Sequence, residues 1–123
     1  MTFLRPIFSI LSLILTFSFS YSQDVTLSLD GGDLNYSSTA DIYGFQFDHD
    51  GCVTGAAGGE AANNGFITSA SGSVVLGFSF SGTFVPAGEG TLTELSGDVS
   101  QDCLSNLVFS GQGGSTLTAG WSE

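Results

Sequence analysis

The sequence has almost no basic residues. Arg5 is the only Lys or Arg, against twelve Asp and Glu, and the formal net charge at pH 7 is −11. Proteins that bind nucleic acids need Lys and Arg to displace the counterions of the phosphates. Anionic membrane surfaces attract basic segments for the same reason. The composition therefore argues against a nucleic-acid partner and against electrostatic attachment to a membrane.

Catalytic and metal-ligating residue types are also scarce. Two Cys and one His cannot supply the four nitrogen and sulfur ligands of a structural zinc site. His49 is the only side chain that titrates near neutral pH, and no Gly-x-Ser-x-Gly motif accompanies it. We expect a surface histidine beside a turn. Asp48 and Asp50 could form a glycosidase pair, but no pattern indicates a cleft, so the sequence predicts a protein that is not an enzyme and has no cofactor.

The only long hydrophobic run lies near the start of the chain. Residues 7–17 (IFSILSLILTF) follow Arg5 and precede the small residues Ser20 and Ser22. This is the pattern of a secretory signal peptide cleaved after Ser22, and the run is shorter than the about 20 residues of a membrane anchor. We predict a signal peptide over residues 1–22 and one domain over residues 23–123, secreted or at the cell surface, without membrane insertion after cleavage. Loss of Arg5 makes the net charge one unit more negative.

The rest of the chain alternates between apolar and polar residues. In residues 24–30, Val25, Leu27 and Leu29 share one face, which is the period of a half-buried strand. Residues 42–48 (IYGFQFD) place three aromatic side chains on one face, Tyr43, Phe45 and Phe47. Such a row predicts the centre of a core.

Residues 73–81 (SVVLGFSFS) form the clearest strand pattern. The large side chains of Val74, Leu76, Phe78 and Phe80 share one face, and the smaller Val75 and Gly77 share the other. We therefore predict that the row of large residues points inward and faces the aromatic row Tyr43, Phe45 and Phe47 across the core.

The 18 glycines and the turn signals divide the remainder into short pieces. Residues 55–65 (GAAGGEAANNG) predict a long connection with one helical turn over residues 60–64. Further strands are expected over residues 34–37, 66–69, 90–95, 107–110 and 116–121. Together, these strand patterns and turn signals predict an all-β fold, an antiparallel β-sandwich of seven to nine strands.

Cys52 and Cys103 are the only cysteines of the chain. An even count in a small exported domain predicts a disulfide, with two free buried thiols as the alternative. The bond would close a loop of about 50 residues and stabilise the fold by roughly 4 kcal/mol.

The densest polar cluster is Asp48-His49-Asp50-Gly51. Asp48 and Asp50 are weak calcium candidates, because Ca²⁺ prefers carboxylate oxygens. The spacing is not that of an EF-hand, since the fifth position is Cys52 and the twelfth is Gly59. The alternative is a solvated Asp-Gly turn.

Three amphipathic aromatic residues, Tyr36, Tyr43 and Trp121, could stack on sugar rings if a sheet face exposed them. Tyr43 shares its face with Phe45, and Trp121 shares its face with Leu117. Both therefore fit a core position as well as a sugar platform.

Three stretches resemble the cohesin-like modules of secreted bacterial proteins. They are residues 42–48 (IYGFQFD), residues 58–66 (GGEAANNGF) with the hydrophobic strand of residues 72–81, and residues 85–95 (VPAGEGTLTEL). The resemblance implies a jelly-roll sandwich. Its relatives bind dockerin modules, and the related superfamily includes carbohydrate-binding modules.

Three functions remain open at this point. The first is a non-enzymatic binding or scaffold module for protein–protein contact or surface adhesion, with a dockerin-like or other surface protein as partner. The second is a carbohydrate-binding module of a polysaccharide-degrading system. The third is a structural subunit of an extracellular fibre or matrix, assembled by strand addition at a sheet edge. The residues that would bind the ligand are not identified by the sequence.

Overall fold

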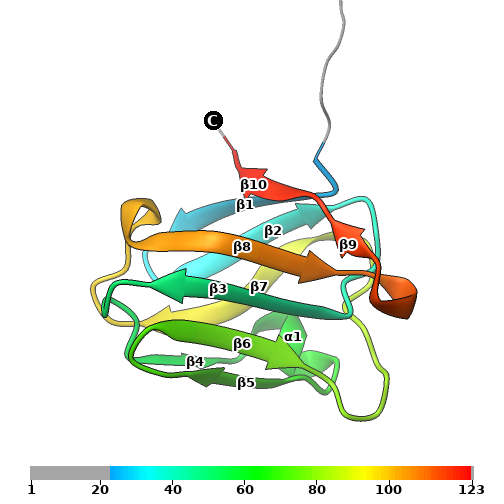
Figure 1. Ribbon diagram of the computed structural model, residues 1–123, viewed down its shortest axis with the longest axis horizontal. Coiled ribbons are helices and arrows are strands. Elements are labelled where there is room, and N and C mark those ends of the chain that lie inside the picture. The colour runs from blue at the N-terminus through cyan, green and yellow to red at the C-terminus, as the bar shows by residue number, and fades with distance from the viewer. Residues whose placement is uncertain (1–22, 123) are drawn as a thin grey trace, which may run out of the picture.

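Two five-stranded sheets pack face to face in the protein (Figure 1). The computed structural model describes residues 23–122, so the predicted signal peptide, residues 1–22, lies outside the described residues. The prediction of an all-β antiparallel sandwich is confirmed, with ten strands where seven to nine were expected.

The first sheet has the strand order β10-β1-β2-β7-β4. Its neighbours are antiparallel except for β1 and β10, which run parallel and bring the two ends of the domain together. The strands are β1 Val25–Asp30, β2 Asp33–Ser38, β4 Gly55–Ala57, β7 Gly88–Ser96 and β10 Ala119–Trp121.

The second sheet has the order β5-β6-β3-β8-β9 and is entirely antiparallel. It lies in front of the first sheet in Figure 1. Its strands are β3 Gly44–His49, β5 Ile67–Ala70, β6 Val74–Phe78, β8 Leu104–Ser110 and β9 Thr116–Leu117.

The connections explain two differences from the predicted elements. The glycine-rich connection contains strand β4 as well as the helical turn, which is α1 (Gly59–Asn63). The predicted strand over residues 116–121 is two strands, because the chain passes from the second sheet to the first at Thr118. Reciprocal hydrogen bonds hold this crossing: Thr118 N donates to Asp24 Oδ2 at 2.9 Å, and Asp24 N donates to Thr118 Oγ1 at 2.8 Å.

In the part of the chain that is described, no helix has the length and apolar character to cross a membrane.

Two of the three aromatic side chains that were predicted to form the centre of the core do so, Phe45 and Phe47 of β3. Phe45 and Phe47 are 3% and 0% exposed. The ring of Phe45 lies 5.9–6.3 Å from the rings of Phe47, Phe66 and Phe109. Tyr43, which precedes β3, is half-buried and packs on Phe84 with 4.9 Å between ring centroids.

The predicted orientation of β6 is wrong. This strand is the neighbour of β3 in one sheet and does not face it across the core. Val75 is fully buried, whereas Phe78 is half-buried on the outer side and Phe80, beyond the strand, is 82% exposed. The reason is the pair Phe45–Gly77: a Cβ atom at position 77 would overlap the Phe45 ring. The inner side of β6 therefore has a small residue because its neighbour on β3 fills that space.

Candidate functional site

The predicted disulfide is present between Cys52 and Cys103, with 6.5 Å between their Cα atoms. It joins the segment after β3 to the 3₁₀ turn that precedes β8. No free cysteine exists, so neither sulfur is available as a thiolate nucleophile or ligand.

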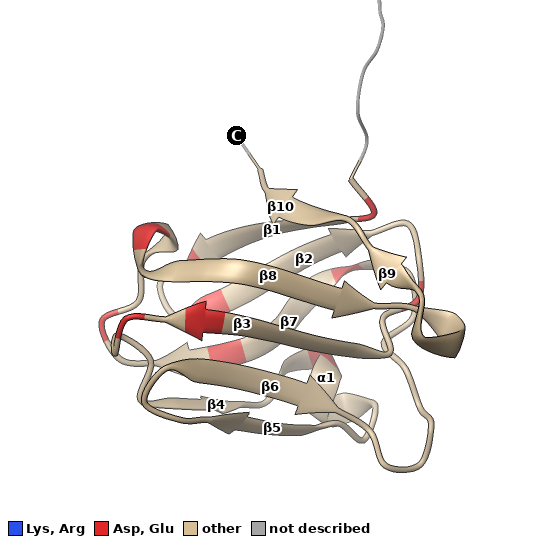
Figure 2. Cartoon of the chain, viewed as in Figure 1, with Lys and Arg blue, Asp and Glu red and all other residues tan. Residues whose placement is uncertain are grey.

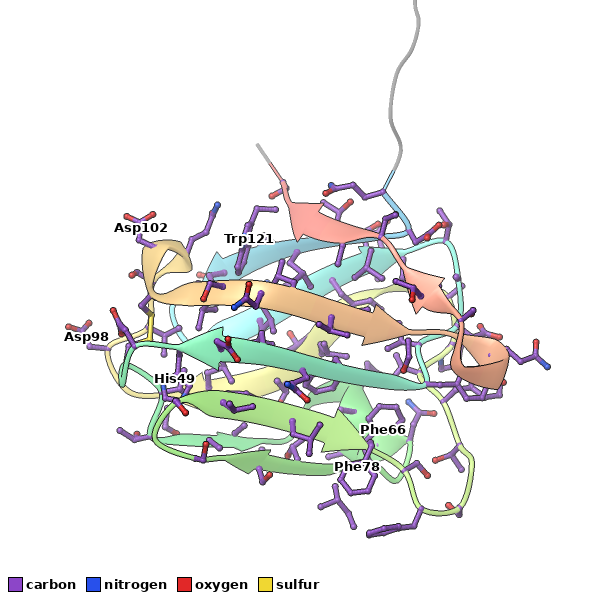
Figure 3. The ribbon with its side chains drawn as sticks, viewed as in Figure 1. His49, Phe66, Phe78, Asp98, Asp102 and Trp121 are labelled. Carbon is purple, nitrogen blue, oxygen red and sulfur yellow. A yellow bond between two sulfur atoms is a disulfide. The ribbon has the colours of Figure 1, made fainter. Side chains whose placement is uncertain are left out.

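His49 is buried and not a surface residue, so that prediction is wrong. Its side chain is 6% exposed at the end of β3 (Figure 3). Nε2 donates to the carbonyl of Ser71 at 2.8 Å, and Nδ1 accepts from the N–H groups of Gly51 at 3.0 Å and Val53 at 3.4 Å. Only the neutral tautomer with its proton on Nε2 satisfies these contacts. Nδ1 thus holds the loop after β3, and Nε2 ties the end of β3 to the turn between β5 and β6.

Asp48 and Asp50 lie on either side of His49, at the end of β3 and in the turn. Asp48 Oδ2 accepts a hydrogen bond of 2.7 Å from Asn106 Nδ2, and Asp50 is exposed. Across residues 23–122, the one group of three potential metal ligands combines Asp50 with the two sulfur atoms of the disulfide. Disulfide sulfurs carry no thiolate, so this group is a poor cation site. Calcium binding by Asp48 and Asp50 stays a prediction.

The amphipathic aromatic residues do not form an exposed platform. Tyr36 is 6% exposed on the inner side of β2, and its pKa is raised, first by desolvation on burial and then by the charge of Glu60. Trp121 is half-buried on β10, opposite Leu27 and against the edge of the core (Figure 3).

The outer side of the second sheet carries large hydrophobic residues. Three are strongly exposed: Ile67 at 49%, Phe80 at 82% and Val108 at 53%. Between them lie the half-buried side chains of Val74, Leu76 and Phe78 on β6. These were predicted to point into the core, but they face solvent. We call this surface the apolar face; it comprises Ile67, Val74, Leu76, Phe78, Phe80 and Val108. The rings of Phe78, labelled in Figure 3, and Phe80 meet edge to face, with 4.8 Å between their centroids, and form its most aromatic part.

A hollow of about 240 Å³ lies within the apolar face, over Gly44. In the sheet register, Gly44 lies between Phe78 on β6 and Ser110 on β8, so the middle position of this row has no side chain. The walls of the hollow come from Tyr43, Gln46, Leu76, Phe78 and Val108. It can receive an apolar side chain from outside.

Acidic side chains gather at one end of the sandwich (Figure 2). Asp98 and Asp102 of the loop before β8 lie at the left of Figure 3, near His49, which Asp48 and Asp50 flank in the sequence. No Lys or Arg occurs among residues 23–122 to neutralise them. The charged side chains at this margin of the apolar face are therefore all acidic.

A second hollow, of about 440 Å³, lies on the outer side of the first sheet, on the opposite side of the molecule. Two rows of polar side chains line it, and each row crosses β1, β2 and β7. We call it the polar hollow; its rows are Thr26–Ser37–Glu89 and Ser28–Asn35–Thr91, with Ser122 at the margin.

Neither surface could be located from the sequence. The apolar face consists largely of residues that alternate like core residues, and only the Phe45–Gly77 pairing reveals their true direction. The polar hollow has a visible signal, since polar residues alternate in β1 and β2, but the contribution of β7 depends on strand pairing. Comparison of the chain with protein-family models, curated proteins and solved structures gave no match.

Proposed function

We propose that the chain is a secreted, non-enzymatic binding module whose apolar face docks on a protein partner. The observation that carries the proposal is a group of large hydrophobic side chains on the outer side of the second sheet. Ile67 and Val108 are exposed, Phe78 is half-buried, and Phe78 and Val108 line the hollow over Gly44. Single exposed hydrophobic residues are common on soluble proteins, but contiguous ones on a sheet face are typical of interaction sites.

The size of the hollow favours a macromolecular partner. The volume of the hollow, about 240 Å³, is smaller than the roughly 300–1,000 Å³ of ordinary small-molecule pockets. A protruding Leu, Ile or Phe of a protein partner would fill the position that Gly44 leaves open. The exposed ring of Phe80 has the character of a binding hot spot, because aromatic anchors contribute strongly when they are desolvated.

The acidic charge of the chain indicates which kind of partner can bind. Residues 23–122 contain no Lys or Arg. Asp48 lies at the margin of the apolar face, opposite Val74, and Asp50 follows in the turn. A second copy would bring acidic residues against acidic residues, which disfavours self-association. The expected partner combines an apolar surface with Lys or Arg around it. A dockerin-like protein, implied by the resemblance to cohesin-like modules, belongs to this class if it carries such a surface.

The test compares two faces of the same molecule. The immobilised chain, residues 23–123, is used to capture partners from the culture medium of the source organism, and the purified partner is titrated by calorimetry. The variant Ile67→Ser/Phe78→Ser/Val108→Ser should lose about a hundredfold in affinity, since truncated interface anchors typically cost more than 1 kcal/mol each. The matched control Ser28→Ala/Ser37→Ala, on the other sheet, should bind like the parent.

Equal affinity of the parent and the apolar-face variant would overturn the proposal. Circular dichroism establishes that both variants are folded. Sedimentation of the parent alone tests the fibre or matrix alternative, because concentration-dependent assembly would favour such a subunit over a docking module.

A further inference from the structure

The side chains that line the polar hollow come from two rows that cross three strands. Thr26 lies opposite Ser37 and Ser37 opposite Glu89, while Ser28 lies opposite Asn35 and Asn35 opposite Thr91. Five of these six side chains are short and uncharged. Leu27 and Tyr36 have buried side chains, so their backbone forms the floor of the hollow together with Gly90.

The lining can both donate and accept hydrogen bonds. Hydroxyl groups do either, and an amide offers one acceptor and two N–H donors. Thr91 Oγ1 donates to Asn35 Oδ1 at 2.7 Å, which orients the Asn35 amide with its Nδ2 free of any protein acceptor among the described residues. Four side chains of the rows, Thr26, Ser28, Asn35 and Thr91, are half-buried, so a ligand would meet groups that are already partly ordered.

The same lining excludes other ligand classes. An anionic ligand would find no Lys or Arg and would meet the carboxylate of Glu89. An apolar peptide would find no exposed hydrophobic side chain in the hollow, and a cation would find a single carboxylate where several oxygen ligands are needed. A neutral polyhydroxylated molecule matches the set, and Glu89 can accept from its hydroxyl groups. The volume of the polar hollow, about 440 Å³, lies within the range of small-ligand sites, roughly 300–1,000 Å³.

We infer that the polar hollow binds a short stretch of a neutral oligosaccharide, on the opposite side of the molecule from the apolar face. This inference is independent of the protein-docking function. No exposed aromatic ring lines the hollow, so the affinity comes from hydrogen bonds alone, and we expect a Kd of about 1 mM. A module with both surfaces would link a protein partner to a neutral glycan.

The experiment is a titration of the isotope-labelled chain, residues 23–123, followed by amide correlation spectra. The probes are cellohexaose, xylohexaose, mannohexaose and laminarihexaose, each raised to about 20 mM, well above the expected Kd. At least one of them should give saturable shifts at the amides of β1, β2 and β7 that carry the two rows. Oligogalacturonate, which is anionic, should give none.

Two variants separate binding from folding. Thr91→Val keeps the shape of the side chain and removes its hydroxyl, and Asn35→Ala removes the amide; each should weaken binding by about tenfold through the hydrogen bonds that are lost. The matched control Ser69→Ala, on the second sheet, should bind like the parent. The inference is overturned if no neutral probe gives saturable shifts at these rows, or if binding survives both variants in a folded chain.

Discussion

Truncation of two phenylalanines in neighbouring strands tests the orientation of the second sheet. Phe45 on β3 is 3% exposed and lies within 6.3 Å of three other aromatic rings, whereas Phe78 on β6 is half-buried on the outer side. Phe45→Ala removes a whole buried ring and leaves a cavity, which typically costs about 3–5 kcal/mol.

The expected cost of Phe78→Ala is smaller. This side chain loses its edge-to-face contact with Phe80, worth about 0.5–1.5 kcal/mol, and part of its apolar burial, but it leaves no enclosed cavity. A total of about 1–2 kcal/mol follows, against a stability of about 5–15 kcal/mol for a domain of this size. Phe45→Ala should therefore approach the limit of stable folding, and Phe78→Ala should remain well folded.

Urea unfolding followed by fluorescence and circular dichroism measures both costs as free energies of unfolding. Gln46→Ala, an exposed position on β3, is the matched control and should change the free energy by less than about 0.5 kcal/mol. Equal losses for Phe45→Ala and Phe78→Ala would refute the assignment of β6, because they would place Phe78 inside the core.

Three further predictions concern stability. Reduction of the disulfide should lower the free energy of unfolding by about 4 kcal/mol; an unchanged melting temperature after complete reduction would contradict this. The pKa of Tyr36 is raised by burial and by Glu60, so its phenol ionises first in the unfolded chain and stability should fall as pH rises above about 10. The variant Tyr36→Phe should lose this alkaline dependence. An identical pH profile of stability for the variant and the parent would contradict the prediction. If Asp48 and Asp50 bind Ca²⁺, millimolar calcium should raise the melting temperature more than NaCl of equal ionic strength; equal effects would leave a solvated turn.

Alternation predicted the strands whose two sides differ clearly in polarity. In β1, Val25 and Leu27 point inward as expected, and in β3 Phe45 and Phe47 do the same. A period of two is sufficient there, because only one side carries large apolar residues. The disulfide followed from the cysteine count and the predicted export.

The pattern failed in β6, where both sides are apolar. The inner side is set by how well a residue fits its neighbour across the strands, and Gly77 is inside because Phe45 needs the room. Size alone therefore gave the wrong side. The prediction of a surface position for His49 was wrong for a related reason. Its burial depends on hydrogen bonds with the Ser71 carbonyl and two backbone N–H groups, which no local sequence pattern indicates.

The candidate binding surfaces depend on strand order, which the sequence does not contain. The polar hollow needs β7 beside β2, and β7 lies some 50 residues further along the chain. The hollow over Gly44 needs β6 and β8 on the two sides of β3. Local alternation indicates which residues share a side of one strand, but not which strands lie together.

Hydroxyl-radical footprinting of the chain, free and bound to its captured partner, tests the docking of the apolar face most directly. The reagent oxidises accessible aromatic and aliphatic side chains, so Phe80, Phe78 and Val108 should be labelled in the free chain. Partner binding should protect these three residues and leave the labelling of Trp121, on the other sheet, unchanged. Unchanged labelling of Phe78 and Phe80 in a saturated complex would contradict the proposed function.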